Sequence, residues 1–109
     1  MLVGGIRMDH RIADNRVAIA DLCLKFRVRR LELFGSAAME APGREPADFD
    51  FLVEFGDLGA GEWADAYFGL KESLEALLSR PVDLVMPKGL DNPYLLRSIN
   101  RNRIGLYAA

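Results

Sequence analysis

The sequence predicts a small α/β or α+β domain in which helices pack on a mixed β-sheet. Three observations indicate this class: segments of alternating apolar residues, stretches with apolar residues at helical spacing, and turn-forming residues between them. The chain has 109 residues, 50% of them hydrophobic, which suits one modest core and leaves no room for two catalytic domains. We therefore expect a single domain over residues 1–109, with residues 1–10 as a loosely ordered N-terminal extension.

The first helix is expected over residues 12–26, where charged side chains separate an apolar stripe. Apolar positions recur there at near-helical spacing, as in an amphipathic helix. The lone cysteine belongs to this stripe, so we expect it in the core, and one cysteine cannot form an internal disulfide. The stripe consists of Val17, Ala20, Cys23 or Leu24, and Phe26.

Two strands separated by a loop are expected next. Residues 28–34 alternate apolar and charged side chains and stop at Gly35 and Ser36. Residues 41–46 are dense in proline and glycine, which predicts a loop. Residues 48–55 then place apolar side chains on one face of a second strand, with Asp48 and Asp50 on the opposite face.

The longest helix is predicted after the turn region at residues 56–61, and it ends at residues 79–81. Residues 82–86 form a third short strand with Asp83 at its start, and Asn92 followed by Pro93 predicts a short helix to about residue 101. By spacing, the aromatic residues near the start of the long helix belong mostly to the core, although an exposed one could anchor an interface. These aromatic residues are Trp63, Tyr67 and Phe68. The apolar stripe of the helix consists of Trp63, Ala66, Tyr67, Leu70, Leu74, Leu77 and Leu78.

Two carboxylates one residue apart on a strand are a candidate metal site. Asp48 and Asp50 would project from one face about 7 Å apart at the backbone, so their tips could converge on one divalent cation. Asp83, on a neighbouring strand, is the candidate third ligand, and three carboxylates favour Mg²⁺ or Mn²⁺. Gly35 leaves the backbone uncovered and Ser36 offers a hydroxyl, both suited to phosphate oxygens. Each pattern alone is weak, since exposed carboxylates are common, but the ordered combination is specific.

These residues resemble a known family. Leu33-Phe34-Gly35-Ser36, followed by Asp48-Phe49-Asp50-Phe51-Leu52-Val53, resembles the Gly-Ser and Asp-x-Asp signature of the DNA polymerase beta-like nucleotidyltransferase superfamily. The subgroup it is most similar to is the minimal nucleotidyltransferases (MNT) of bacteria and archaea, which act as antitoxins for HEPN-domain toxins. The similarity in residue order extends from about residue 17 to residue 106 and implies the polymerase beta-like palm fold.

The resemblance also implies an activity and a set of roles. It implies metal-dependent transfer of AMP from ATP to a tyrosine of a partner HEPN toxin, with Mg²⁺ or Mn²⁺ as cofactor. Asp48 and Asp50 would hold the metals, and Asp83 would bind one metal and help to activate the attacking hydroxyl. Gly35 and Ser36 would contact the triphosphate. An oligomer formed with the partner is compatible with this reading.

Two positions depart from the family pattern. Met39 and Glu40 stand where active members usually carry arginine and glycine, so a fixed positive charge near the phosphates is missing. Arg44, in the following loop, could replace it or be ordinary surface. Two readings therefore stay open: an active enzyme, or an MNT-fold antitoxin that neutralises its toxin by binding with little or no catalysis.

Composition argues against other partners. Fourteen basic and 16 acidic residues give a net charge of -2, with no general attraction to nucleic acid or anionic membranes. We interpret residues 25–30 and the set Arg97, Arg101 and Arg103 as solvated surface. The lone histidine, His10, has no second histidine or cysteine with which to share zinc. No apolar run suits a membrane span and no signal peptide is evident, so we expect a cytoplasmic protein without membrane or direct nucleic-acid binding.

Overall fold

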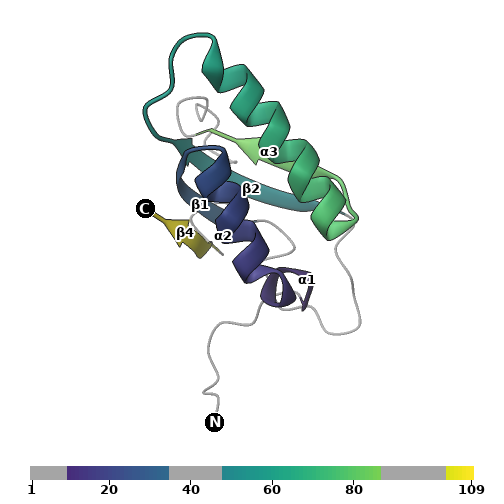
Figure 1. Ribbon diagram of the computed structural model, residues 1–109. Coiled ribbons are helices and arrows are strands. Elements are labelled where there is room, and N and C mark those ends of the chain that lie inside the picture. The colour runs from purple at the N-terminus through teal and green to yellow at the C-terminus, as the bar shows by residue number, and fades with distance from the viewer. Residues whose placement is uncertain (1–9, 35–47, 87–102) are drawn as a thin grey trace, which may run out of the picture.

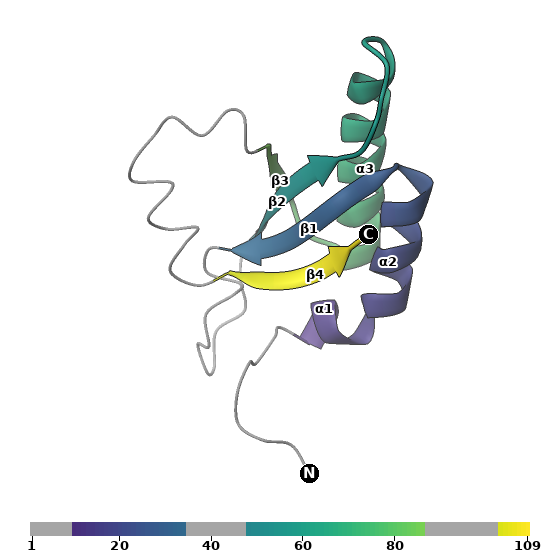
Figure 2. The same ribbon diagram turned by 90° about the vertical axis from the view of Figure 1, so that its left-hand side faces the viewer.

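A four-stranded sheet with helices packed on one face forms the domain (Figures 1 and 2). The computed structural model describes residues 10–34, 48–86 and 103–109. Its elements are α1 (His10–Asp14), α2 (Arg16–Lys25), β1 (Val28–Phe34), β2 (Phe49–Phe55), α3 (Glu62–Leu78), β3 (Val82–Val85) and β4 (Ile104–Ala108). The predicted fold class, a small mixed sheet covered by helices, is confirmed. The loop at residues 41–46 and the helix predicted near residues 93–101 lie outside the described residues.

The strand order in the sheet is β3-β2-β1-β4. β1 is antiparallel to both β2 and β4, whereas β2 and β3 are parallel. Parallel neighbours need a long crossover, and α3 provides it between β2 and β3. The sequence prediction ended with a helix and missed β4, although Ile104 and Leu106 alternate with Gly105 in the manner of a strand.

The core lies between the sheet and the helices, on the face to which alternate strand residues point. Phe49, Phe51 and Val53 of β2 are all fully buried there, as their period-two spacing predicts. The neighbouring strands and α3 complete the cluster with Leu31, Leu33, Leu70, Leu74, Leu78, Val82 and Leu84. This leaves the opposite face of the sheet free of helices among the described elements, as Figure 2 shows.

The predicted first helix is divided into two at Asn15. The Asn15 side-chain amide donates a hydrogen bond to the carbonyl of Arg11 at 2.7 Å, and its backbone amide donates to the carbonyl of Ile12 at 3.2 Å. A side chain that bonds the local backbone in this way competes with regular helical bonding. α1 is therefore a separate short helix, and His10 begins it; residues 1–9 lie outside the described residues.

The apolar stripe predicted for this helix is partly wrong. Of the two alternatives Cys23 and Leu24, Cys23 is the fully buried one and Leu24 is 66% exposed, but Val17 is 77% exposed, so its expected place in the stripe is wrong. The buried partner of Cys23 is Ile19, four residues earlier and so on the same helix face. Val17 precedes Ile19 by two residues, about 200° around the helix, and so points away from the sheet.

The long helix α3 matches its prediction except for two aromatic residues. Trp63 is 46% exposed and Phe68 is 56% exposed, so their expected core positions are wrong. Phe68 lies two residues from both Ala66 and Leu70, which are buried, and it therefore faces outward. Tyr67 is partly buried, and its hydroxyl donates a hydrogen bond to the Leu84 carbonyl of β3 at 2.7 Å.

None of the helices within the described ranges combines the length and the apolar character that crossing a bilayer requires.

Candidate active site

Three aspartates meet on the face of the sheet opposite the helices. Asp50 of β2 is directly across from Asp83 of the parallel strand β3, and Asp48 immediately precedes β2. A carboxylate oxygen from each of the three lies within 4.8 Å of the others. The structure thus brings together the three carboxylates that the sequence singled out.

The fold itself places these side chains on the open face. In β2, Phe49 and Phe51 are buried in the core, so Asp50 between them must project to the other side. In β3 the same alternation buries Val82 and Leu84 and turns Asp83 outward. The apolar residues that stabilise the sheet therefore also determine where the carboxylates point.

The cluster carries unfavourable electrostatic interactions in the absence of a cation. The pKa of Asp50 is raised to about 6, first by its partial burial and then by the negative charges of Asp48 and Asp83. A hydrogen bond that protonated Asp50 donates to the carboxylate of Asp83 raises this pKa further. Asp48 and Asp83 are exposed, so the cluster is open to solvent.

The donor set suits a hard divalent cation. Three carboxylates within contact range of one point are the oxygen ligands that Mg²⁺ and Mn²⁺ prefer, and the charge of the ion would remove the repulsion that raises the Asp50 pKa. Asp48, Asp50 and Asp83 are thus the residues that could hold such an ion.

The predicted phosphate-contacting residues follow β1 in the chain. Gly35 and Ser36 lie outside the described residues, as do Met39 and Arg44. The last residue of β1, Phe34, is directly across from Asp50. β1 therefore ends beside the carboxylate cluster.

An ion pair on the same face was not predicted from the sequence. Glu32 of β1 lies two residues before Phe34, and its Oε2 is 3.5 Å from Nε of Arg103, the residue before β4. The other oxygen, Oε1, is buried and has no hydrogen-bond partner among the described residues. From the sequence, Arg103 is interpreted as solvated surface, and its side chain is 41% exposed. Its pairing with Glu32 depends on β4, which the alternation of Ile104 and Leu106 could have indicated.

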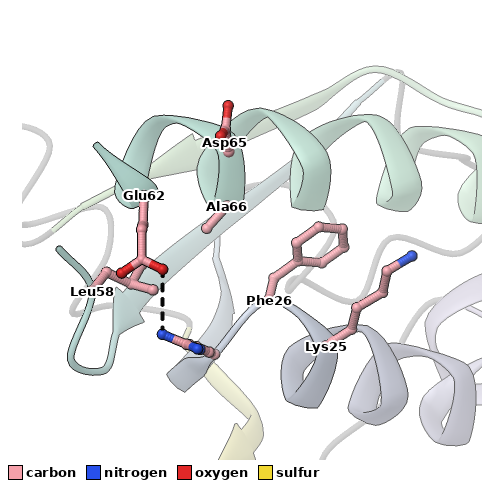
Figure 3. Close-up of a pocket in the computed structure, with 7 residues that line it drawn as sticks. Lys25, Phe26, Leu58, Glu62, Asp65 and Ala66 are labelled. Carbon is pink, nitrogen blue, oxygen red and sulfur yellow. Dashed lines mark ion pairs between the residues drawn. The ribbon is translucent and has the colours of Figure 1, made fainter. Parts of the chain in front are cut away.

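A separate hollow of about 260 Å³ lies at the helix side of the domain (Figure 3). It is lined by the end of α2, the start of α3 and the loop after β2: Lys25, Phe26, Arg27, Leu58, Glu62, Asp65 and Ala66. Arg27 Nη1 and Glu62 Oε2 form an exposed ion pair of 3.6 Å across its edge. The hollow shares no residue with the carboxylate cluster, and we place the chemistry at the cluster, because that is where charged groups converge.

Sequence comparisons connect this arrangement to known proteins. Residues 16–106 match the family model of the nucleotidyltransferase domain. Two Methanocaldococcus jannaschii proteins, both provisionally named protein adenylyltransferases, are similar to the chain. MJ1379 is 36% identical over 80 residues, covering 73% of this chain and 78% of the relative. MJ0128 is 37% identical over 82 residues, with the same coverage of both chains.

Structural comparisons agree with this family. A solved structure described as a provisional minimal nucleotidyltransferase is 36% identical and has a TM-score of 0.66, covering 92% of this chain and 98% of its own. A complex of a tri-AMPylated HEPN toxin with its MNT antitoxin from Shewanella oneidensis has a TM-score of 0.59 at 22% identity. That likeness covers 89% of this chain and 72% of the other and concerns the fold alone.

Proposed function

The chain belongs to the nucleotidyltransferase domain family, in its minimal (MNT) group, and we propose that it transfers AMP from ATP to a tyrosine of a HEPN-domain partner protein. The observation that carries the proposal is the convergence of Asp48, Asp50 and Asp83 on the open face of the sheet. The relatives provisionally named protein adenylyltransferases support the choice of a protein as acceptor.

Each residue of the site has a role in this proposal. Asp48, Asp50 and Asp83 hold Mg²⁺ or Mn²⁺, and such an ion, when bound, offsets the charge of the triphosphate. Asp83 also orients the attacking hydroxyl and accepts its proton. The tyrosine oxygen then forms a bond to the α-phosphorus, the bond to the bridging oxygen breaks, and pyrophosphate leaves. Gly35 and Ser36, next in the chain after Phe34, contact the phosphates.

The open geometry of the site supports a macromolecular acceptor. Asp48 and Asp83 are exposed on a sheet face that none of the described helices covers. A tyrosine on a folded protein can approach such a face, whereas a small acceptor would gain little enclosure there. The solved complex of a HEPN toxin with an MNT antitoxin provides the precedent for the class of partner. A cytoplasmic location, where ATP is available, is part of the proposal.

Intact-mass analysis of the partner tests the proposal. The protein is incubated with ATP, Mg²⁺ and a HEPN-domain protein from the same organism, with Asp48→Asn and Asp57→Asn in parallel. Asp57 is an exposed aspartate just beyond the other end of β2, so its substitution controls for the general loss of a carboxylate. We expect one or more AMP units on the partner with the wild type and with Asp57→Asn. Asp48→Asn should lower the rate at least about 100-fold, as the loss of a metal ligand would.

A second function is favoured by the two departures in the sequence motif. If Met39 and Glu40 mark a degenerate site, the chain neutralises its partner by binding alone. The partner would then gain no mass, a stable complex would still form, and Asp48→Asn would neutralise the toxin as well as the wild type does. That result would replace the enzymatic proposal.

A further inference from the structure

We propose that Arg103 binds the triphosphate of the nucleotide, on the side of β1 away from the three aspartates. The proposal rests on the function proposed above and names a residue of that same site. It follows from the strand register, from the direction of the side chain and from the charge balance of the site.

The register places Arg103 level with the carboxylates. Ile104 of β4 pairs with Leu33 of β1, so Arg103, one residue earlier on an antiparallel strand, lies beside Phe34. Phe34 pairs with Asp50, and Asp50 pairs with Asp83. These four residues thus form one row across the sheet, and Figure 2 shows β4 beginning beside the end of β1.

The distance along this row suits a phosphate chain. Neighbouring strands lie about 4.8 Å apart, so the backbones of Asp50 and Arg103 are roughly 10 Å apart, with β1 between them. An extended arginine spans more than half of that distance. Phe34 lies between them on this face and is buried. A triphosphate that passes the end of β1 beyond this ring could contact a metal at the carboxylates on one side and the guanidinium on the other.

The side chain of Arg103 points to the correct face. Ile104 and Leu106 are buried in the core on the helix side, so alternation directs Arg103 to the face of the carboxylates. Its contact with Glu32 is direct evidence for this direction, because Glu32 alternates with the buried Leu31 and Leu33. The Arg103 side chain is 41% exposed, so its guanidinium can be reached from solvent.

Glu32 holds this arginine in place. The contact joins Oε2 of Glu32 to Nε of Arg103, and a guanidinium has further N–H donors on its terminal nitrogens. Glu32 is only 14% exposed and so provides a fixed support from the middle of the sheet. Planar donors oriented in this way suit a phosphate better than a flexible ammonium does.

The negative charges of the triphosphate and the aspartates exceed the positive charge that divalent ions would supply, so a further cationic group would stabilise the bound nucleotide. A triphosphate carries about four negative charges, and the three aspartates add three more when ionised. Two divalent ions would offset only about four of these seven charges. Arg103, on the side of β1 away from the aspartates, can offer positively charged N–H donors to the phosphates, while Glu32 at 3.5 Å offsets part of its charge.

Nucleotide binding tests the proposal with a matched control. The affinities of the full chain for ATP and for AMP are measured by calorimetry with Mg²⁺, for the wild type, Arg103→Gln, Arg103→Lys and Arg30→Gln. Arg30 lies on the same face of β1, four residues before Phe34 and at the far end of the strand. We expect Arg103→Gln to weaken ATP binding about 10-fold or more and to change AMP binding less than about 2-fold. Arg103→Lys should fall between wild type and Arg103→Gln, and Arg30→Gln should resemble wild type.

Three results would overturn the proposal. ATP affinity in Arg103→Gln equal to that of wild type would leave Arg103 as a structural partner of Glu32. Equal losses for ATP and AMP would show that the triphosphate is not what Arg103 contacts. Equal losses in Arg103→Gln and Arg30→Gln would indicate a general effect of net charge. A different result would contradict the function proposed above: the wild type binds ATP through Arg103, but no AMP is found on the partner.

Discussion

The position of Asp50 in the sheet, partly buried beside two other carboxylates, determines both its pKa and its suitability as a cation ligand. Burial and two neighbouring carboxylates raise its pKa to about 6, from an ordinary value near 3.8. A proton on Asp50 and a cation at the cluster are alternative ways to reduce the same repulsion. The stability of the fold should therefore depend on pH and on divalent cations through this one carboxyl group.

The raised pKa predicts a specific pH dependence of stability. The folded protein binds the Asp50 proton more tightly than the unfolded chain, so this group stabilises the fold as the pH falls from about 6 toward 4 and destabilises it as the pH rises through 6. In the presence of EDTA, we expect Asp50→Asn to be more stable than wild type at pH 7.5, and this advantage to shrink toward pH 4.5. Thermal melts of both proteins across this range measure the difference.

Mg²⁺ provides the control for this experiment. An ion at the carboxylates should stabilise the wild type at pH 7.5 and have much less effect on Asp50→Asn. A stability difference between the two proteins that does not change with pH would contradict the electrostatic role of Asp50.

At the scale of elements, two contacts help to position α3, in addition to its core packing and the hydrogen bond from Tyr67 to Leu84. On the β3 side, Glu75 Oε2 accepts hydrogen bonds from the Val82 amide at 2.9 Å and from Lys71 Nζ at 3.1 Å. The bond from the Val82 amide is the main cause of the lowered pKa of Glu75. On the α2 side, Gly69 leaves room for the ring of Phe26. The first contact connects the helix to the strand that carries Asp83.

The contact between Gly69 and Phe26 predicts that the effect of Gly69→Ala on stability changes sign when the Phe26 ring is removed. A Cβ on Gly69 would lie 2.5, 3.0 and 3.3 Å from three atoms of the Phe26 ring, so the whole ring would have to move. Alanine is otherwise favoured over glycine inside a helix by about 1 kcal/mol. We expect Gly69→Ala to destabilise the wild type and to stabilise a Phe26→Ala background by up to about 1 kcal/mol. Urea unfolding of the four proteins measures the cycle, and stabilisation in both backgrounds would show that the ring does not fill this space.

The sequence predicted the elements that have a strong repeat and a defined end. Residues 28–34 form β1 with the predicted bounds, because their alternation is clear, and α3 has a long apolar stripe. The break at Asn15 was missed because one side-chain hydrogen bond to the backbone decides it. β4 was missed because it has only five residues and follows a region where a helix was expected.

The sequence predicted the three aspartates of the candidate site but not the Glu32–Arg103 pair beside them. Asp48 and Asp50 could be grouped because residues two apart on a strand share a face, and Asp83 could be added because a helical crossover returns the chain to a neighbouring strand; the structure brings the three together. Glu32 and Arg103 could not, because their pairing depends on β4 lying beside β1. Long-range strand order is not contained in local periodicity.

At the scale of the whole molecule, the two faces of the sheet carry different kinds of residue. One face holds the core and the helices, and the other presents the carboxylates and the Glu32–Arg103 pair. Because the same strands carry both sets of residues, the packing that stabilises the domain also aligns its charged groups. In the proposed function, this domain would provide the metal ligands and the phosphate contacts, and a partner protein would provide the acceptor.

The measurement that tests AMP transfer most directly follows the two ends of ATP separately. The protein and its HEPN-domain partner are incubated with Mg²⁺ and ATP labelled at either the α- or the γ-phosphate, and the label bound covalently to the partner is counted. We predict that the α-label is retained on the partner and that the γ-label is released as pyrophosphate. Retention of the γ-label would indicate phosphoryl transfer, and retention of neither label would mean that no AMP is transferred; either result would contradict the proposed reaction.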